Sequence, residues 1–297
     1  MKVLLGVSLS KKNYKFLTKF LENLNNLIIL NEIDLQFIFV LEEKNFILRE
    51  IIFKKLINKK FKILFIKKNG IPHSRNKFLY YVRTTKSKFI GFLDDDCLIP
   101  RNWLKNMLKF IKFSSCDLVG GPQLHKTTNE FYSVLFKLIE PKNEDSSNID
   151  WAATNNVFFK SNILLNNNHL FDEKLKNIGG SDQLFFQKLK KNFKLIYKWN
   201  INSPVYENIQ LERENLRWFI NRNFRYGYSG YFIEKSIYGK YLGIFINISK
   251  FFLLIMKSCI FLFFFLDKKY LFKSIFFLSK ALGRFIALTN YKPKKYI

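Results

Sequence analysis

The chain has 297 residues, and its 50 Lys and Arg against 23 Asp and Glu make the formal net charge +27. Hydrophobic residues make up 48% of it, with only 12 Gly and 6 Pro, which excludes disordered, fibrous and collagen-like proteins. The charge favours an anionic partner, but compositional drift toward Lys, Asn, Ile and Phe produces the same excess, so charge alone decides nothing. Three widely separated cysteines form neither a disulfide framework nor a metal knuckle, which favours a reducing setting.

Short apolar runs alternate with amphipathic segments along residues 1–121. The runs that we predict to be strands are Val3–Val7, Leu35–Leu41, Ile63–Ile66, Phe89–Leu93 and Leu118–Val119. The segments with helical spacing between them are Tyr14–Asn25, Phe46–Leu56, Ser74–Arg83 and Asn102–Phe113. This alternation predicts an α/β fold with a mostly parallel, Rossmann-like sheet and helices on both faces. Because the first strand follows Met1 almost directly, we expect no signal peptide.

The pattern changes twice further along the chain. A helix is expected to begin near Gly179-Gly180-Ser181-Asp182, and an amphipathic, Arg-rich region follows residue 205. We therefore divide the chain into an α/β domain over residues 1–205, a basic linker region over 206–240 and membrane-associated helices over 241–297.

The last sixty residues contain two apolar segments, Leu242–Leu266 and Tyr270–Leu288. Two pairs of lysines interrupt them at a spacing of seven residues, which places each pair on one helix face: Lys250 with Lys257, and Lys273 with Lys280. An aromatic-rich helix with a basic stripe is suited to lie in a membrane interface. A spanning hairpin and buried core helices are the alternatives, and we favour in-plane or shallow re-entrant helices because a hairpin would carry Lys268 and Lys269 across.

The stretch with the clearest chemistry is Phe89–Cys97, in which an apolar strand ends in three consecutive carboxylates, Asp94, Asp95 and Asp96. Ligands of open parallel sheets bind beyond the carboxyl ends of the strands. Mg²⁺ or Mn²⁺ prefers such hard oxygen ligands and would bridge them to a diphosphate. The alternative is an acidic turn that caps a helix starting at Asn102.

Other catalytic motifs are missing from the sequence. It has no P-loop, no G-x-G-x-x-G after the first strand and no G-x-S-x-G, and its three histidines have no zinc-site spacing.

Several motifs resemble those of the family 2 glycosyltransferases, which have the GT-A fold, and they occur in the family's order over residues 1–230. The motifs are Lys68-Asn69-Gly70 with Ser74-Arg75-Asn76, then Leu93–Asp96, then Gly179–Leu184, then Arg222–Gly227. The resemblance implies a metal-dependent enzyme of the hexosyltransferase type that inverts the configuration of the transferred sugar.

The resemblance also implies roles for individual residues. Asp182 matches the family's general base, which takes the proton of the acceptor hydroxyl. Asp96 matches the residue that holds the divalent cation, and Arg75, Asp94 and Asp95 fall where the nucleotide portion of the donor binds. A first-turn acid such as Asp182 is also favoured by the helix dipole, and Arg75 on spacing alone is equally a solvated cation.

The chain departs from the family's pattern in several places. Glu42 ends the second strand where Asp-Asp is typical, and it remains suited to hydrogen-bond the nucleotide base. Glu207 stands near the position of a histidine metal ligand and either replaces it or forms a salt bridge with Arg213 or Arg217. In the second case Asp96, the diphosphate and water would hold the metal. The region that lines the acceptor side in the family corresponds to Trp151, Asn155 and Asn156. Trp218 is suited to stack on a sugar ring, and core or interface packing is its alternative role.

We therefore expect a glycosyltransferase that moves a sugar from a nucleotide-sugar donor to a glycan or lipid-linked acceptor, with Mn²⁺ or Mg²⁺, at the cytoplasmic face of the inner (plasma) membrane. The alternatives are a nucleotidyltransferase and a non-catalytic basic scaffold that binds membrane or RNA. No nucleic-acid partner is expected, because the aromatic residues concentrate in the C-terminal apolar segments and not among surface lysines.

Overall fold

The computed structural model describes residues 1–9, 14–43, 45–165, 168–289 and 291. The chain forms two compact units. The first unit comprises Met1–Leu124, Pro141–Glu173 and Phe185–Asn208, and the second comprises His125–Glu140, Lys174–Leu184 and Ile209–Ile297. Each unit is therefore assembled from separate stretches of the sequence.

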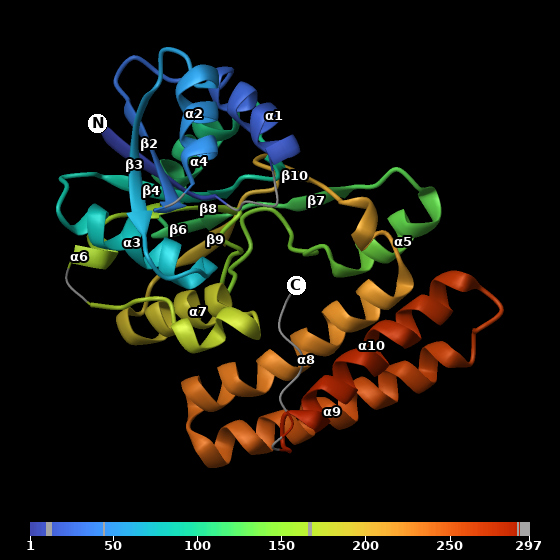
Figure 1. Ribbon diagram of the computed structural model, residues 1–297. Coiled ribbons are helices and arrows are strands. Elements are labelled where there is room, and N and C mark those ends of the chain that lie inside the picture. Colours follow the sequence, from blue (N-terminus) through green and yellow to red (C-terminus); the bar gives the residue numbers. More distant parts are fainter. Residues whose placement is uncertain (10–13, 44, 166–167, 290, 292–297) are drawn as a thin grey trace. The chain divides into compact units, whose positions relative to one another are not determined.

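The first unit is built on a seven-stranded sheet (Figure 1). Its strands are β1 (Lys2–Ser8), β2 (Asp34–Glu42), β3 (Lys60–Ile66), β4 (Phe89–Asp94), β6 (Leu118–Gly120), β8 (Asn156–Lys160) and β9 (Tyr197–Trp199). They lie in the order β3-β2-β1-β4-β8-β6-β9. All neighbouring pairs are parallel except those of β8, which runs antiparallel to β4 and β6. The mostly parallel sheet predicted from the alternation of segments is confirmed.

Helices cover both faces of this sheet, because successive strand residues point to opposite sides. On one side Leu5 of β1 belongs to a core cluster with α1 (Tyr14–Asn25), α2 (Phe46–Lys55) and α4 (Trp103–Phe113). On the other side Leu4 belongs to a cluster with α3 (Ile71–Arg83), α6 (Asn162–Leu165) and part of α7 (Ser181–Phe193). The predicted strands and helices of residues 1–121 all occur, with ends that differ by three residues or fewer.

A second, three-stranded sheet follows the carboxyl end of β4. It consists of β5 (Cys97–Leu98), β10 (Val205–Asn208) and β7 (Gln123–Lys126), in the order β5-β10-β7. In the antiparallel pair of β5 with β10, Glu207 is the register partner of Cys97. This pairing brings a residue from the end of the α/β region next to Cys97, which directly follows the three carboxylates Asp94–Asp96.

The second unit is helical. It contains α5 (Glu130–Ile139), α8 (Leu216–Tyr238), α9 (Lys240–Leu262) and α10 (Lys268–Ile286), together with the short 3-10 turn Leu211–Arg213 and, except for Glu173, the 3-10 turn Glu173–Asn177. Helices α8, α9 and α10 run side by side (Figure 1). Backbones of α8 and α10 touch, because a Cβ on Gly227 would lie 2.0 Å from the Lys280 carbonyl oxygen. On the facing helix, a Cβ on Gly283 would lie 1.9 Å from the Phe224 carbonyl oxygen.

Within the described part of the chain, α9 is the one helix that is long and apolar enough to cross a membrane, judged by length and composition. Only 11% of its most apolar stretch is buried. Because a core helix of a globular protein is mostly buried, α9 is not a core helix.

Candidate active site

The three acidic residues lie where β4 ends. Asp94 is the last residue of β4, and Asp95 and Asp96 form the turn that leads into β5. Asp95 is 4% exposed, whereas Asp94 and Asp96 are half-buried. Since the turn continues into a strand and α4 begins only at Trp103, the triplet does not cap a helix. We call Asp94, Asp95 and Asp96 the acidic turn.

Glu207 joins the acidic turn through the pairing of β5 with β10. The thiol of Cys97 is buried beside these acids. Its pKa is raised mainly by burial and further by the negative charges of Asp96, Asp94, Glu207 and Asp95. Glu207 is 6% exposed and accepts a hydrogen bond from the side-chain amide of Gln123 in β7. Four carboxylates from two distant parts of the sequence therefore act on one thiol.

Arg75 lies beside the acidic turn. Its guanidinium Nη2 is 3.8 Å from Asp94 Oδ1, and the Arg75 side chain is only 8% exposed. The Arg75 Cζ atom lies 5.6 Å from the centre of the Phe171 ring, at a distance typical of a cation–π contact. The guanidinium is thus held over an aromatic ring with its charge directed at the end of β4.

The first turn of α3 explains why Arg75 is placed there. Gly70 precedes the helix with a φ of 137°, a conformation that favours glycine, and its carbonyl accepts the amide hydrogen of Ser74. Asn76 then bonds both backbone groups of Phe171: its Nδ2 donates to the carbonyl at 3.0 Å and its Oδ1 accepts from the amide at 2.8 Å. The residues on either side of Arg75 in the sequence therefore fix its position: Gly70 sets the start of α3, and Asn76 ties the helix to Phe171.

Glu42 ends β2, which is parallel to β1, as is β4. The carboxyl ends of parallel strands lie at one edge of a sheet, so Glu42 and Asp94 share that edge, with β1 between them. The Glu42 side chain is half-buried. This is the edge at which the sequence predicted the nucleotide base.

Asp182 belongs to the second unit and is described there by itself. It lies in the first turn of α7, and its Oδ1 accepts the amide hydrogen of Gln183 at 2.9 Å. Gly179 and Gly180 precede the helix with φ values of 94° and 79°. A Cβ on Gly180 would lie 2.8 Å from Ile233 Cδ1 in α8, so this glycine permits α7 to begin against α8. Asp182 itself is half-buried.

Two of the residues expected to contact a sugar have structural contacts. Asn156 accepts a hydrogen bond from the Trp103 indole at 2.8 Å and donates to the carbonyls of Pro122 and Ser203, both at 2.8 Å. It is 1% exposed, so its amide is not available to a sugar and that expectation is wrong. Trp218 has the Arg222 guanidinium 4.9 Å from its ring centre, within α8.

Sequence reasoning missed two residues that support the site, Phe171 beneath Arg75 and Gln123 beside Glu207. Neither lies in a recognisable motif, because each acts through a contact between segments that are distant in sequence. A buried aromatic and an amide in a strand are ordinary in any fold. Only the register of β5 with β10 and the packing of α3 reveal them.

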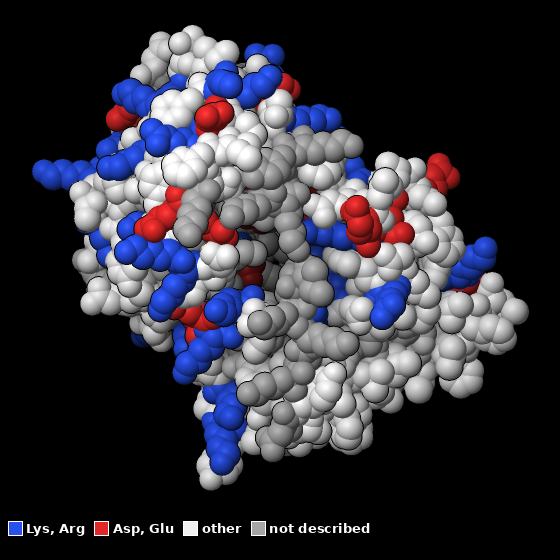
Figure 2. Space-filling view, in the orientation of Figure 1, with Lys and Arg blue, Asp and Glu red and all other residues white. Residues whose placement is uncertain are grey.

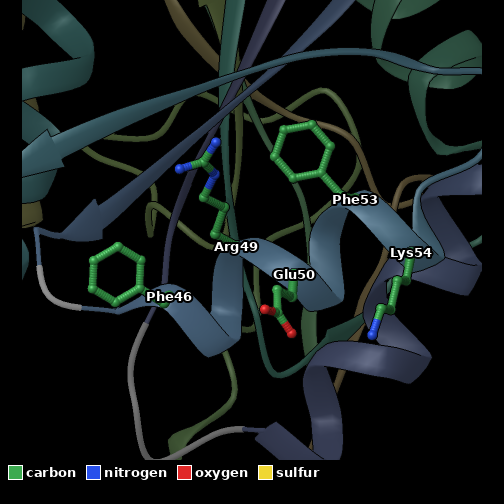
Figure 3. Close-up of a pocket in the computed structure, with 5 residues that line it drawn as sticks. All are labelled: Phe46, Arg49, Glu50, Phe53 and Lys54. Carbon is green, nitrogen blue, oxygen red and sulfur yellow. The ribbon is translucent and has the colours of Figure 1, made fainter.

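Two other surface features contain none of the candidate residues. A hollow of about 400 Å³ on α2 is lined by Phe46, Arg49, Glu50, Phe53 and Lys54, with Arg49 above the Phe53 ring (Figure 3). Lys and Arg lie among Asp, Glu and uncharged residues on the face shown in Figure 2. Neither feature indicates a nucleotide site.

The donor set of the acidic turn suits a divalent cation that is shared with a substrate. Among the described residues, no group of three or more His, Cys, Asp or Glu side chains could hold a metal ion by itself. Mg²⁺ is usually bound by one or two carboxylates together with substrate phosphates and water, so three protein ligands are not required. The partly exposed Asp96, with Glu207 opposite Cys97, fits that arrangement.

Comparison with known proteins gives a family and a fold. The family model described as glycosyl transferase family 2 matches residues 10–173. The S. aureus TarS 1–349 structure in complex with UDP-GlcNAc is 14% identical with a TM-score of 0.55, and the match covers 98% of this chain and 93% of that one. TarS 1–349 alone is 15% identical, with a TM-score of 0.53 and the same coverage.

A longer S. aureus TarS structure is 16% identical with a TM-score of 0.50, and the match covers 79% of this chain but only 43% of the TarS chain. The present chain thus spans less than half of that protein. No curated protein matches. At such identities the structural similarity shows the GT-A-like fold, and the family model shows the family.

Proposed function

This chain belongs to glycosyl transferase family 2 and is a glycosyltransferase, and we propose that it moves a sugar from a nucleotide-sugar donor to a glycan or lipid-linked acceptor with inversion at the anomeric carbon. The observation that carries the proposal is the meeting of the acidic turn, Arg75 and Glu207 at the carboxyl end of β4. In open α/β sheets this edge is where ligands bind. The TarS complex with UDP-GlcNAc supports a donor of the uridine diphosphate-sugar class.

We assign the donor's diphosphate and nucleoside to four residues. Arg75 is suited to a phosphate oxygen, since its planar guanidinium is fixed by Phe171 and Asp94. Glu42 and Asp94 accept hydrogen bonds from the base and ribose. The buried Asp95 shapes the turn that links Asp94 to Asp96. These groups bind and orient the donor.

Asp96 and Glu207 are the residues we propose for a divalent cation, Mn²⁺ or Mg²⁺. Carboxylate oxygens are the ligands these cations prefer. Asp96 directly precedes Cys97, and Glu207 is the register partner of Cys97 on the neighbouring strand. When bound, the cation would offset the negative charge of the departing diphosphate.

Asp182 is the proposed general base. In the reaction the acceptor hydroxyl oxygen forms a bond to the anomeric carbon while the bond from that carbon to the diphosphate oxygen breaks. The leaving nucleoside diphosphate keeps the electron pair, and the hydroxyl proton passes to the Asp182 carboxylate. Attack from the face opposite the leaving group inverts the anomeric configuration.

We place the enzyme at the cytoplasmic face of the inner (plasma) membrane, where nucleotide sugars are made and where a lipid-linked acceptor would be presented. The apolar α9 and the positive charge of the chain support this location.

A donor panel tests the function. Purified full-length protein is incubated with a series of nucleotide sugars and Mn²⁺ or Mg²⁺, and release of nucleoside diphosphate is followed with and without a glycan or lipid-linked acceptor. We expect release with one class of donor, stimulated by the acceptor and abolished by chelation. Absence of turnover with every donor would favour a non-catalytic scaffold.

A further inference from the structure

One face of α9 is apolar and exposed along the whole helix. Its side chains recur every three or four residues, which is the spacing of a single helix face. They are Tyr241, Phe245, Ile248, Phe252 and Met256, which are 83%, 67%, 39%, 64% and 53% exposed. The turn after α9 continues this surface, with Phe263 and Leu266 at 83% and 89%. We call the five helical residues the apolar stripe.

The opposite face of α9 is tied to its neighbours. Gly243 packs against the backbone of Lys235 in α8, where a Cβ would lie 2.6 Å from the Lys235 Cα. Ser258 exchanges hydrogen bonds of 2.9 and 3.0 Å with Ser274 of α10. Asn247, fully buried, donates to the Arg284 carbonyl at 3.1 Å. The apolar stripe is therefore the face of α9 that contacts neither α8 nor α10 and stays exposed.

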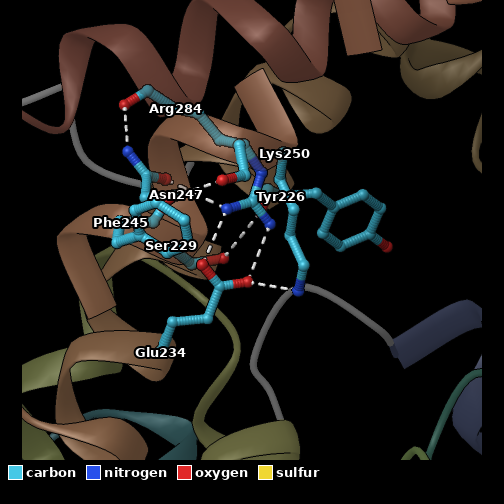
Figure 4. Close-up of polar contacts among 8 residues, drawn as sticks. Tyr226, Ser229, Glu234, Phe245, Asn247, Lys250 and Arg284 are labelled. Atoms are coloured by element: carbon cyan, nitrogen blue, oxygen red, sulfur yellow. Dashed lines mark hydrogen bonds and ion pairs between the residues drawn. The ribbon is translucent and has the colours of Figure 1, made fainter. Parts of the chain in front are cut away.

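A charge network with a buried Glu234 and Arg284 and a half-exposed Lys250 joins the three helices at this opposite face (Figure 4). Glu234 of α8 accepts two hydrogen bonds from the Arg284 guanidinium of α10, at 2.9 and 3.1 Å. Lys250 of α9 donates to the same carboxylate at 2.6 Å. Arg284 also donates to Asn247 at 3.0 Å. Such a network fixes one arrangement of three helices, since any other leaves a charge unpaired.

The lysines that interrupt the apolar segments contact neighbouring helices. Lys250 bonds Glu234, and Lys257 lies 5.7 Å from the centre of the Phe277 ring in α10. The apolar stripe consequently contains no charged side chain. Lys250 and Lys257 are exposed but lie away from the stripe, and further exposed lysines stand near its two ends, Lys235 and Lys240 at one and Lys268 and Lys269 at the other. Asp267 is the one acidic residue between positions 235 and 289.

We propose that α8, α9 and α10 form a slab that lies flat on an anionic lipid bilayer, with the apolar stripe and the Phe263–Leu266 turn in the acyl boundary and α9 parallel to the membrane surface. The lysines near both ends of the stripe complement anionic headgroups, each contributing about 1 kcal/mol near such a surface. This geometry rests on the proposed membrane location and goes beyond it by fixing the face and the direction of insertion.

A spanning α9 conflicts with these contacts. A helix of 23 residues is about 35 Å long, enough to cross a bilayer. However, α8 packs alongside, and it would carry Arg222, Arg225 and Glu234 into the hydrocarbon. Each charge at the bilayer centre costs about 2.5–3.5 kcal/mol on insertion scales. If α9 instead crossed alone, Asn247 and Lys250 would lose their partners near its middle.

Depth measurements at the two ends of α9 test the proposal. Tyr241→Cys and Phe265→Cys are made separately in the Cys259→Ser full-length chain, labelled with the fluorophore NBD, and added to preformed phosphatidylglycerol-containing vesicles. We expect both probes to brighten on binding and both to be quenched by external dithionite. Protection of one probe from dithionite would show that α9 spans and would overturn the flat slab.

Binding variants test the docking face. Phe245→Glu and Phe252→Glu should each weaken vesicle co-sedimentation at least about tenfold, as expected for one lost apolar anchor. Phe113→Glu, at a site of the first unit that is even more exposed (79%), is the control and should bind as the parent does. Equal losses in all three, equal binding to pure phosphatidylcholine vesicles, or a lipid-free dimer that buries the stripe would overturn the proposal.

Nucleoside diphosphate release with a soluble acceptor is measured on the same samples. Absence of vesicle binding with intact turnover would reject the membrane slab alone, whereas binding without turnover would reject the proposed function alone.

Discussion

Cys97 stands directly opposite Glu207 in the antiparallel pair of β5 with β10, although 110 positions separate them in the sequence. The consequence is that an isolated acid from a late strand joins the carboxylates of the acidic turn around one buried thiol. Like charges repel one another unless a cation or donors offset them. Arg75 lies 3.8 Å from Asp94 and Gln123 donates to Glu207, and the proposed cation would offset the remaining charge.

Asp96→Asn should abolish Mn²⁺-dependent donor binding while the melting temperature changes little, because the side chain is half-buried at a turn. Isothermal calorimetry with a nucleoside diphosphate and Mn²⁺ measures this. Asp150→Asn is the control, since the Asp150 side chain is 76% exposed and pairs with Lys190 at the surface. Unchanged affinity in the Asp96 variant would contradict its assignment to the cation.

Asp182→Asn should leave donor affinity nearly intact while kcat falls by about 10²–10⁴, the usual contribution of a general base. The amide preserves the shape of the side chain and its place in the first turn of α7. Steady-state kinetics at saturating donor, combined with calorimetry, separate the two quantities. A parallel loss of affinity and turnover would indicate a structural role for this acid.

Arg75→Lys should weaken donor binding by about tenfold or more, because lysine keeps the charge but lacks the planar fork and the stacking on Phe171. Arg49→Lys is matched to it, since Arg49 also lies 5.6 Å from a phenylalanine ring but on an exposed helix. The KM for the donor is the readout. If both variants behave alike, Arg75 does not contact the donor.

Glu234→Gln should lower the free energy of unfolding by about 3–5 kcal/mol, because it leaves the Arg284 guanidinium buried without its carboxylate. Thermal and urea unfolding measure the loss. Glu234→Leu combined with Arg284→Leu removes both charges and should recover much of the stability. If the double variant loses as much free energy of unfolding as the single variants Glu234→Leu and Arg284→Leu lose together, the pair is not coupled.

Iodoacetamide at pH 8 should modify Cys259 in the lipid-free protein and spare Cys97 and Cys116. Cys259 is exposed, whereas the other two are buried, and burial together with the neighbouring acids raises the pKa of Cys97. A raised pKa reduces the reactive thiolate at any pH below it, so Cys97 should stay unmodified until the chain unfolds. Mass spectrometry of tryptic peptides identifies the modified sites, and early modification of Cys97 would contradict its burial.

Much of the fold could be predicted because periodicity is a local property. The near-continuous apolar run of β4 reflects burial on both of its faces, and the helical spacing of Leu17, Leu21 and Leu24 in α1 reflects burial of one face. Both patterns are visible in consecutive residues. The reversed direction of β8 could not be predicted in this way, since a short apolar strand reads alike in both directions.

The same distinction between local and long-range features applies to the candidate site. Sequence by itself determined the acidic turn, the glycine before α3 and the acid in the first turn of α7, because motif chemistry and backbone conformation involve neighbouring residues. Tertiary structure alone decided that Glu207 meets the acidic turn, that Phe171 lies beneath Arg75 and that the α9 lysines turn toward α8 and α10. These contacts depend on strand register and helix packing, which are set by the free energy of the whole folded chain and not by neighbouring residues.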